Sequence, residues 1–271
     1  NSDWIEEFPS ETYNYPRLYD YTYESAIEDL GIRLNFIYDF NPKHQLNFGG
    51  SYVKHRFSPS FIDLITDNDN GYSDTTMTFS NEKRPDEAFI YFEDQYTITD
   101  RLTSSLGVNY SIYHENSKFY NSIQPRISFR YLLNENSSLK FSYATMQQNI
   151  HLLTNSSYGL PNDIWVPATS DVPPQFSEQV VAGFNQSFDE NSIECSLELY
   201  YKKMDKLIAY AEGSNILGTN FSSWEDRVEI NGTGNSYGLE LFLKKNKGKL
   251  TGWIGYTLSR SIRQFDRINL G

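Results

Sequence analysis

The chain has 271 residues, of which 23 are Lys or Arg and 35 are Asp or Glu, so its formal net charge is −12. That acidic balance argues against nucleic acid as a partner, because nucleic acids bind basic surfaces. A single cysteine, Cys195, excludes a disulfide framework and a thiolate metal cluster. No run of about 18 apolar residues occurs, which excludes transmembrane helices. Aromatic residues nevertheless make up 16% of the chain, although all hydrophobic types together reach only 38%.

The predicted elements are β-strands, because apolar and polar residues alternate with a period of two rather than 3.6. The first strand starts near residue 27, and its even positions from Leu30 to Phe40 are apolar while most odd positions are polar. Nine further segments alternate in the same way: 45–57, 87–98, 102–112, 123–131, 138–148, 175–188, 193–201, 234–245 and 250–262. The sequence therefore predicts an all-β protein with ten strands.

The connections between these strands are of two alternating kinds. Short gaps of three or four residues, rich in Asn, Asp, Pro, Gly or Lys, are typical of hairpin turns. They fall at 41–44, 99–101, 134–137, 189–191 and 246–249. Longer gaps lie between them, at 58–86, 114–121, 149–174 and 205–233. Tight turns at one end and long loops at the other are typical of an outer-membrane barrel, whose periplasmic turns are short and whose extracellular loops are long.

A transmembrane antiparallel up-and-down β-barrel also explains the strand lengths and the aromatic residues. Strands of about eleven to thirteen residues, rising ~3.3 Å each and tilted near ~45°, cover about 25 to 30 Å of membrane. Tyr and Trp favour the two membrane interfaces. We expect the apolar face to meet lipid at ten positions: Leu34, Phe36, Leu106, Val108, Ile127, Phe129, Leu197, Leu199, Leu241 and Ile254. The polar face then lines a lumen and carries Arg126, Arg130 and Glu240.

The number of strands indicates that the barrel is incomplete. If the short turns are periplasmic, ten strands leave both ends of the chain on the extracellular side. Complete bacterial barrels start and finish in the periplasm, so we expect an interior piece of a longer barrel. The opening Asn-Ser-Asp-Trp, which is neither a signal peptide nor a translation start, agrees with that expectation.

Several segments resemble a known family. They are Asn231-Gly-Thr-Gly-Asn-Ser-Tyr-Gly-Leu-Glu240, Leu241-Phe-Leu-Lys-Lys245, Leu250-Thr-Gly-Trp-Ile-Gly-Tyr-Thr-Leu-Ser-Arg260, Gln124-Pro-Arg-Ile-Ser-Phe-Arg130 and Leu199-Tyr-Tyr-Lys-Lys-Met204. Together they resemble the late barrel strands of TonB-dependent outer-membrane receptors, especially those of Bacteroidetes, over roughly residues 85–262. The glycines of the first segment equally suit a loop that enters a strand, where backbones approach closely.

The resemblance implies a 22-stranded barrel, plugged by an N-terminal globular domain, that takes up a scarce nutrient with energy passed on by TonB. Residues 1–271 would then be a partial barrel domain of the bacterial outer membrane, without the plug and the C-terminal strands. The implied partners are the TonB complex, acting through the plug, the plug itself and outer-membrane lipid, and a surface lipoprotein over the loops is a further candidate. Arg126, Arg130 and Glu240 become candidates for contact with the plug. The nutrient is not implied, because plug and loops largely set it.

Two long loops present candidate ligand-binding residues. Loop 149–174 is stiffened by prolines and presents Trp165, and loop 205–233 presents Tyr210 and Trp224. Aromatic side chains on a pre-ordered loop are suited to hold a ligand. They suit packing of the loop against its neighbours equally well.

Other sites and classes are disfavoured by the sequence. The oxygen-rich run Asp67–Asp74 lacks the glycine and glutamate spacing of the helix–loop–helix calcium site and is interpreted as a solvated turn. A ten-stranded outer-membrane protease could use His55, His114 and His151 near the loop end, but its termini should be periplasmic. An extracellular carbohydrate-binding sheet would not sort its loops by end. We therefore expect no catalytic residues, no cofactor and no metal.

Overall fold

The computed structural model of the chain describes residues 18–68, 71–77, 82–154, 163–188, 192–212 and 223–268. These residues form β1 (Leu18–Asn41), β2 (His44–Asn68), β3 (Gly71–Met77), β4 (Asp86–Thr99), β5 (Leu102–Glu115), β6 (Lys118–Asn134), β7 (Ser137–Gln148), β8 (Ile150–Leu153), β9 (Ile164–Pro167), β10 (Gln175–Phe188), β11 (Ile193–Tyr210), the 3₁₀ helix η1 (Glu225–Arg227), β12 (Val228–Lys245) and β13 (Gly252–Gln264).

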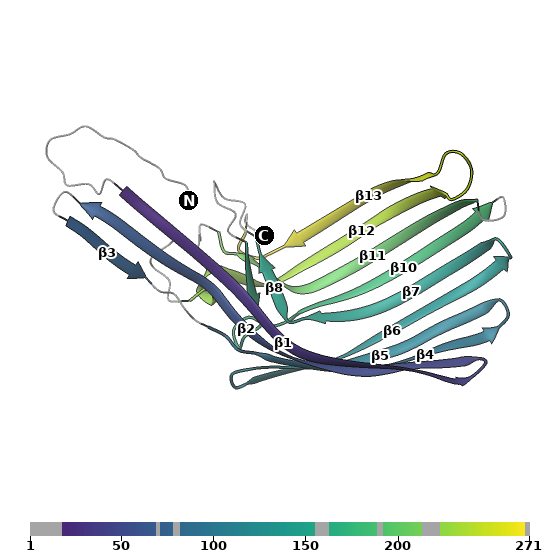
Figure 1. The fold of residues 1–271 in the computed structure, drawn as a ribbon, viewed down its shortest axis with the longest axis horizontal. Coiled ribbons are helices and arrows are strands. Elements are labelled where there is room, and N and C mark those ends of the chain that lie inside the picture. Colours follow the sequence, from purple (N-terminus) through teal and green to yellow (C-terminus); the bar gives the residue numbers. More distant parts are fainter. Residues whose placement is uncertain are drawn as a thin grey trace.

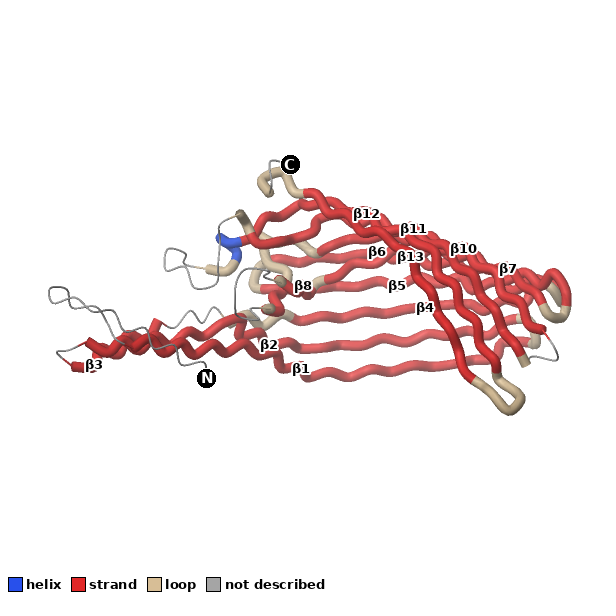
Figure 2. The backbone as a smooth tube through the Cα atoms, turned by 90° about the horizontal axis from the view of Figure 1, so that it is seen from above, coloured by secondary structure: helices blue, strands red, loops and turns tan. Residues whose placement is uncertain are grey.

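Ten of the strands form one antiparallel sheet in the order β1-β2-β4-β5-β6-β7-β10-β11-β12-β13. The short strand β3 pairs with the outer part of β2, and β8 pairs only with β9. The sheet curves into an open trough (Figure 1), and its hairpin turns gather at one end (Figure 2). The predicted ten-stranded, all-β, up-and-down architecture is confirmed, and the described strands do not close into a complete barrel.

The residue at the end of a strand caps each of three hairpin turns. The Asn41 Oδ1 atom accepts hydrogen bonds from the backbone N–H groups of Lys43 (2.8 Å) and His44 (3.1 Å). Thr99 and Asn134 accept equivalent bonds within the turns that follow β4 and β6. Side chains of this kind satisfy turn N–H groups that the ladder leaves unpaired. The short turns were predicted at these places, and they are confirmed.

Two predicted loops are wrong. The segment 58–86 is largely strand, because β2 continues to Asn68 and β3 follows at Gly71. The segment 114–121 is a tight turn, in which Asn116 has a φ of 52°. Asn tolerates this left-handed conformation better than most residues. In the first of these segments Phe61, Ile62 and Ile65 do not follow a period of two, so the alternation that reveals a strand in the sequence is absent although the hydrogen-bonded ladder continues. The first strand is also longer than predicted, because β1 begins at Leu18 rather than near residue 27.

The oxygen-rich run Asp67–Asp74 lies in the hairpin formed by β2 and β3. Asp67 pairs with Tyr72, and Asn68 pairs with Gly71. Residues 69–70 lie outside the described residues. The described part of the run is therefore strand on both sides of the tip, rather than an open loop.

One face of the sheet is apolar across its whole width. Phe36 lies opposite Phe48, which lies opposite Phe92, which lies opposite Val108. The rings of Phe36 and Phe48 stack with their centroids 5.4 Å apart. The register places all ten predicted lipid-facing residues on this face. Removing one such side chain from water contributes about 1.5–3 kcal/mol. An outward-facing apolar band of this kind is typical of a barrel wall in a lipid bilayer.

The opposite, concave face of the sheet is polar. One row across it runs through Asn35, Gly49, Tyr91, Asn109 and Gln124, each opposite the next in the register. The Tyr91 hydroxyl donates a hydrogen bond to the Asn35 Oδ1 atom over 3.0 Å. This face forms the predicted lumen side of the wall, and it carries the candidate site.

Candidate binding site

The connection between β7 and β10 contains a short hairpin, β8–β9, that lies on the concave side of the sheet. β9 contacts β1 and β2, whereas β8 contacts β11, which is far from them in the sheet order. The hairpin therefore spans the trough between its two sides, as Figure 1 shows for β8.

Both ends of this connection are tied to the wall. At its start the Asn149 Nδ2 atom donates a hydrogen bond to the Glu87 Oε1 atom over 2.9 Å. At its far end Tyr113 and Tyr120 donate hydrogen bonds to the backbone oxygens of Ala168 (3.1 Å) and Thr169 (2.7 Å). The hairpin is thus held by strands β4, β5 and β6, none of which is adjacent to it in the sequence.

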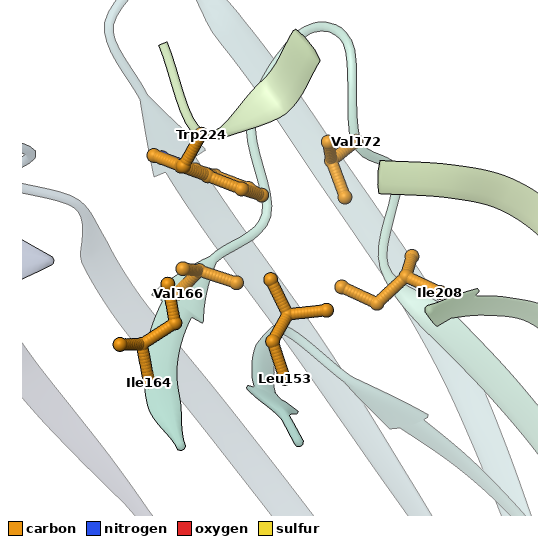
Figure 3. Packing of buried hydrophobic residues seen from close by; sticks show 6 residues of the cluster. All are labelled: Leu153, Ile164, Val166, Val172, Ile208 and Trp224. Atoms are coloured by element: carbon orange, nitrogen blue, oxygen red, sulfur yellow. The ribbon is translucent and has the colours of Figure 1, made fainter. Parts of the chain in front are cut away.

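The hairpin shares a small hydrophobic core with the end of β11 and with the connection between β11 and β12. Its buried members are Leu153, Ile164, Val166, Val172, Ile208 and Trp224, and Leu153 lies at its centre in Figure 3. Full burial of one such aliphatic side chain contributes about 1.5–3 kcal/mol. This core holds the two connections together as one unit.

An ion pair fixes the second connection to the rim. The Lys83 Nζ atom lies 3.1 Å from the Glu225 carboxylate of η1 and 4.0 Å from the Glu115 carboxylate of β5. All three side chains are largely buried. A pair that is shielded from water is screened less by salt than a surface pair, so it supports the fixed position of η1.

A hollow of about 750 Å³ lies between the hairpin and the wall. Its lining includes Trp165 from β9, Gln148 from β7, Gln175 from β10, Lys202 from β11 and Arg263 from β13. This volume lies within the range of small-molecule sites, about 300–1,000 Å³. The hollow is the candidate binding site.

The three predicted aromatic residues have different surroundings. Trp165 is 44% exposed and lines the hollow. Trp224 is buried in the shared core and is only 8% exposed. Tyr210 is partly buried and packs against the same core. Only Trp165 therefore has a surface that a ligand in this hollow can contact, and the packing interpretation describes the other two.

The predicted lumen charges lie on the concave face, nearer the turns. Arg126 lines a hollow of about 260 Å³ together with Arg33 and Glu93. Arg130 lies opposite Lys140 on β7, and both line a larger hollow of about 980 Å³. Farther along the same row, Glu198 lies opposite Glu240. Gly183 separates the two pairs, because it lies opposite both Lys140 and Glu198.

This row sets like charges side by side. Like charges directly opposite each other destabilise a sheet. Within the part of the chain that the structure describes, no ion pair joins Arg130, Lys140, Glu198 or Glu240 to another side chain. A partner that brings the complementary charges would remove both repulsions.

The three rim histidines have separate surroundings. His55 lies between Asp29 (Nδ1 to Oδ1, 2.7 Å) and Glu87 (Nε2 to Oε2, 3.5 Å). His114 stacks on the Phe119 ring at 4.1 Å. His151 of β8 is fully buried, its ring nitrogens make no hydrogen bond, and burial lowers its pKa to about 4.

The described residues contain neither a membrane-spanning helix nor a cluster of metal-binding side chains. No helix in these ranges is long and apolar enough to cross a membrane. Among the same residues, no group of three or more His, Cys, Asp or Glu side chains is placed to hold a metal ion.

Sequence reasoning missed the residues that build the hollow. The alternation predicts Glu87 only as part of a strand and Asn149 only as the start of a loop, and Tyr113 lies between the predicted strand 102–112 and the predicted loop 114–121. The sequence marks these residues only by their position, because each lies at or next to the end of a strand, on the side of the long loops.

A wide antiparallel sheet, with an apolar outer face and a polar inner face, defines the barrel wall of an outer-membrane protein. Residues 2–270 match the family described as TonB dependent receptor-like, beta-barrel. The chain belongs to this family, whose members are outer-membrane receptors and transporters rather than enzymes. The narrower resemblance to Bacteroidetes receptors stays a prediction.

Solved structures of low sequence identity share the fold. The alcaligin outer-membrane receptor FauA from Bordetella pertussis is 16% identical, with a TM-score of 0.56 over 93% of this chain and 41% of that one. The pyoverdine receptor FpvA from Pseudomonas aeruginosa PAO1 is 14% identical, with a TM-score of 0.59 over 91% and 37%. The RagAB peptide importer is 11% identical, with a TM-score of 0.58 over 91% and 31%. This chain thus spans 31% to 41% of these structures, and no curated protein matches its sequence.

Proposed function

We propose that the protein to which this wall belongs binds a scarce nutrient at its extracellular loops and imports it with energy transmitted by TonB. The observation that carries the proposal is the hollow beneath the anchored β8–β9 hairpin, with Trp165 in its lining. A loop that is already ordered loses little conformational entropy when a ligand binds. The site also faces the lumen, through which an imported molecule would leave.

The row of paired charges supports a second part of the proposal, contact with a plug domain. Arg130 and Lys140 offer two cations, and Glu198 and Glu240 offer two anions on the other side of Gly183. A domain in the lumen that presents carboxylates to the first pair and basic groups to the second would relieve both repulsions. TonB would act on the nutrient through this domain. Contact with a surface lipoprotein stays a prediction.

The relatives suggest which nutrients to test first. One solved relative is an alcaligin receptor, another is bound to pyoverdine, and a third is a peptide importer. Iron chelates and oligopeptides are therefore the first two classes to supply, each to the source bacterium and to a strain that lacks the gene for the full-length protein.

The experiment is nutrient uptake combined with cell fractionation. We expect the full-length protein in the outer membrane, with heat-modifiable gel migration, and uptake of one nutrient class that needs both this gene and an intact TonB system. Uptake that persists unchanged when TonB is deleted would refute the energised step. Equal uptake with and without the gene, for both classes, would refute import of those nutrients.

A further inference from the structure

We propose that the hollow under the β8–β9 hairpin selects small organic acids that carry N–H or O–H donors. This inference rests on the proposed function, because it names the class of molecule that the same site would bind. It follows from the charges, hydrogen-bond acceptors and apolar surface of the lining.

Two cations of the lining have no partner of opposite charge. Lys202 is half-buried and Arg263 is exposed, and both line the hollow. Within the described residues no ion pair or hydrogen bond engages either side chain. Partial burial without a counter-ion is unfavourable for the Lys202 cation. A carboxylate in the hollow would compensate these charges.

The register brings the two cations within reach of one ligand. Lys202 lies opposite Ser236, which lies opposite Ser261, two residues before Arg263. Two strand spacings and a two-residue offset put the two Cα atoms about 12 Å apart. The residue between them in the row, Ser236, is small. Both long side chains can therefore meet acid groups of the same small molecule.

Among the described residues the lining has one carboxylate, Glu87, and it is already engaged. Glu87 accepts a hydrogen bond from Asn149 (2.9 Å) and lies 3.5 Å from His55. It also belongs to β4, several strands away from β11 and β13 in the sheet order. Glu87 thus neutralises neither Lys202 nor Arg263, and the side of the hollow formed by these two residues favours an anion.

Three glutamine carboxamides of the lining have oxygens that no other described side chain engages. The Nε2 atoms of Gln124, Gln147 and Gln148 donate to Ser111 (2.9 Å), Asn149 (2.9 Å) and the backbone oxygen of Ile150 (2.6 Å). Each amide group therefore uses one of its two N–H donors within the protein and keeps the other N–H, together with its oxygen, for a ligand. Ligand N–H or O–H groups are the complement of these oxygens.

The lining also has apolar surface beside its polar residues. Trp165, Met146 and Met204 contribute a ring and two flexible thioethers. Aromatic and methionine side chains adapt to carbon-rich parts of varied ligands. Acidic oligopeptides and acidic oligosaccharides share the required combination of carboxylate and donors, so the test includes both.

The test is calorimetric titration of the full-length receptor in detergent with four probes. Two are acetylated tetrapeptides, tetraglutamate and its neutral analogue tetraglutamine. The other two are trigalacturonate and the neutral sugar maltotriose. We expect at least one acidic probe to bind about tenfold more tightly than its neutral counterpart, as expected for a hydrogen bond to a charged group. The acidic probe that binds identifies the source of the acid group.

Two matched pairs of variants locate the effect. Lys202→Gln and Arg263→Gln should each weaken binding of the acidic probe about tenfold. Lys203→Gln and Arg260→Gln remove the same charge from the same two strands, on the opposite face of the sheet. These two controls should bind the probe as the unmodified receptor does. Heat-modifiable migration shows whether each variant is folded.

Three results would overturn the proposal. The first is equal binding of acidic and neutral probes, the second is an equal effect of the inner and outer substitutions, and the third is no binding of any probe. None of them decides the proposed function, because TonB-dependent uptake is measured separately in cells. If the receptor imports a nutrient but shows one of these three results, the proposed function stands and the proposed ligand class is refuted.

Discussion

The Tyr113 hydroxyl donates a hydrogen bond to the Ala168 backbone oxygen over 3.1 Å. Tyr113 is fully buried in the wall, and Ala168 follows the inward hairpin, so this bond joins the two parts. Burial raises the energetic importance of such a bond, because water cannot replace a lost partner.

Removing this hydrogen bond should loosen the hairpin without unfolding the wall. In Tyr113→Phe the Ala168 oxygen is left buried without its donor, at a cost of about 1–3 kcal/mol. We expect amide hydrogen exchange in β8 and β9 to quicken at least about fivefold, with little change in β10 and β11. Tyr110→Phe on the outer face of the same strand is the control. Equal exchange in both variants would show that the bond does not hold the hairpin.

Acidification should open the same hairpin through His151. Its pKa is about 4 when buried and about 6.5 when exposed, so protons bind preferentially to the open state. Stability of the closed hairpin is therefore complete above about pH 6.5 and is lost as the pH falls toward about 4. At pH 5 the loss is about 2 kcal/mol.

Hydrogen exchange of β8 between pH 7.5 and pH 5, corrected for the intrinsic rates, measures this loss. The variant His151→Gln should abolish the pH dependence, whereas His114→Gln should retain it. A pH dependence that survives in His151→Gln would assign the effect to another group.

The two faces of β11 should tolerate charge differently. Leu199 is 50% exposed on the apolar face, and Leu199→Arg near the middle of the membrane should cost roughly 2–4 kcal/mol. The neighbouring Glu198→Gln acts on the lumen face and should have a far smaller effect. Refolding of the full-length barrel into bilayers measures both, and equal folding of the two variants would contradict the assignment of the faces.

Substitution of Glu240, which lies opposite Glu198, should stabilise a barrel that lacks the plug and weaken plug retention in the full-length receptor. In a barrel that lacks the plug, Glu240→Gln removes a repulsion and should stabilise the wall by about 0.2–1 kcal/mol. In the full-length receptor the same change should weaken retention of the plug, because a basic group of the plug would lose a counter-charge.

Urea titrations of both forms, followed by proteolysis of the released plug, compare the two effects. Leu241→Ala, on the outer face next to Glu240, is the control and should not alter plug retention. A change of the same sign in both forms would show that the pair does not contact the plug.

The sequence predicted the membrane-spanning part of the fold and not the part beyond it. Between Leu30 and Phe40 one face meets lipid and the other meets water, and this difference produces alternation that can be read directly. Within β2 the apolar residues Phe61, Ile62 and Ile65 do not follow a period of two, so strand pairing leaves no such pattern there. The tight turn at Asn116 depends on a single left-handed residue, which adjacent polar residues conceal.

The candidate site was predicted only in part. The sequence identifies Trp165 as an aromatic residue in a long loop, and this residue lines the hollow. The hollow itself depends on contacts between distant segments, such as the hydrogen bond from Asn149 to Glu87. Contacts of this kind have no local signature. Trp224 shows the same ambiguity, because an aromatic residue in a polar loop can contact a ligand or fill a core, and here it fills a core.

The shared core of the two connections has a consequence for how such receptors diversify. Ile208 comes from the end of β11 and Trp224 from the connection that follows it, whereas Leu153, Ile164 and Val166 come from the connection between β7 and β10. Replacing either connection alone by that of another receptor would expose half of a hydrophobic core. A change of specificity by recombination must therefore exchange both segments together, and engineers who graft binding loops onto this wall should treat residues 149–174 and 207–228 as one cassette.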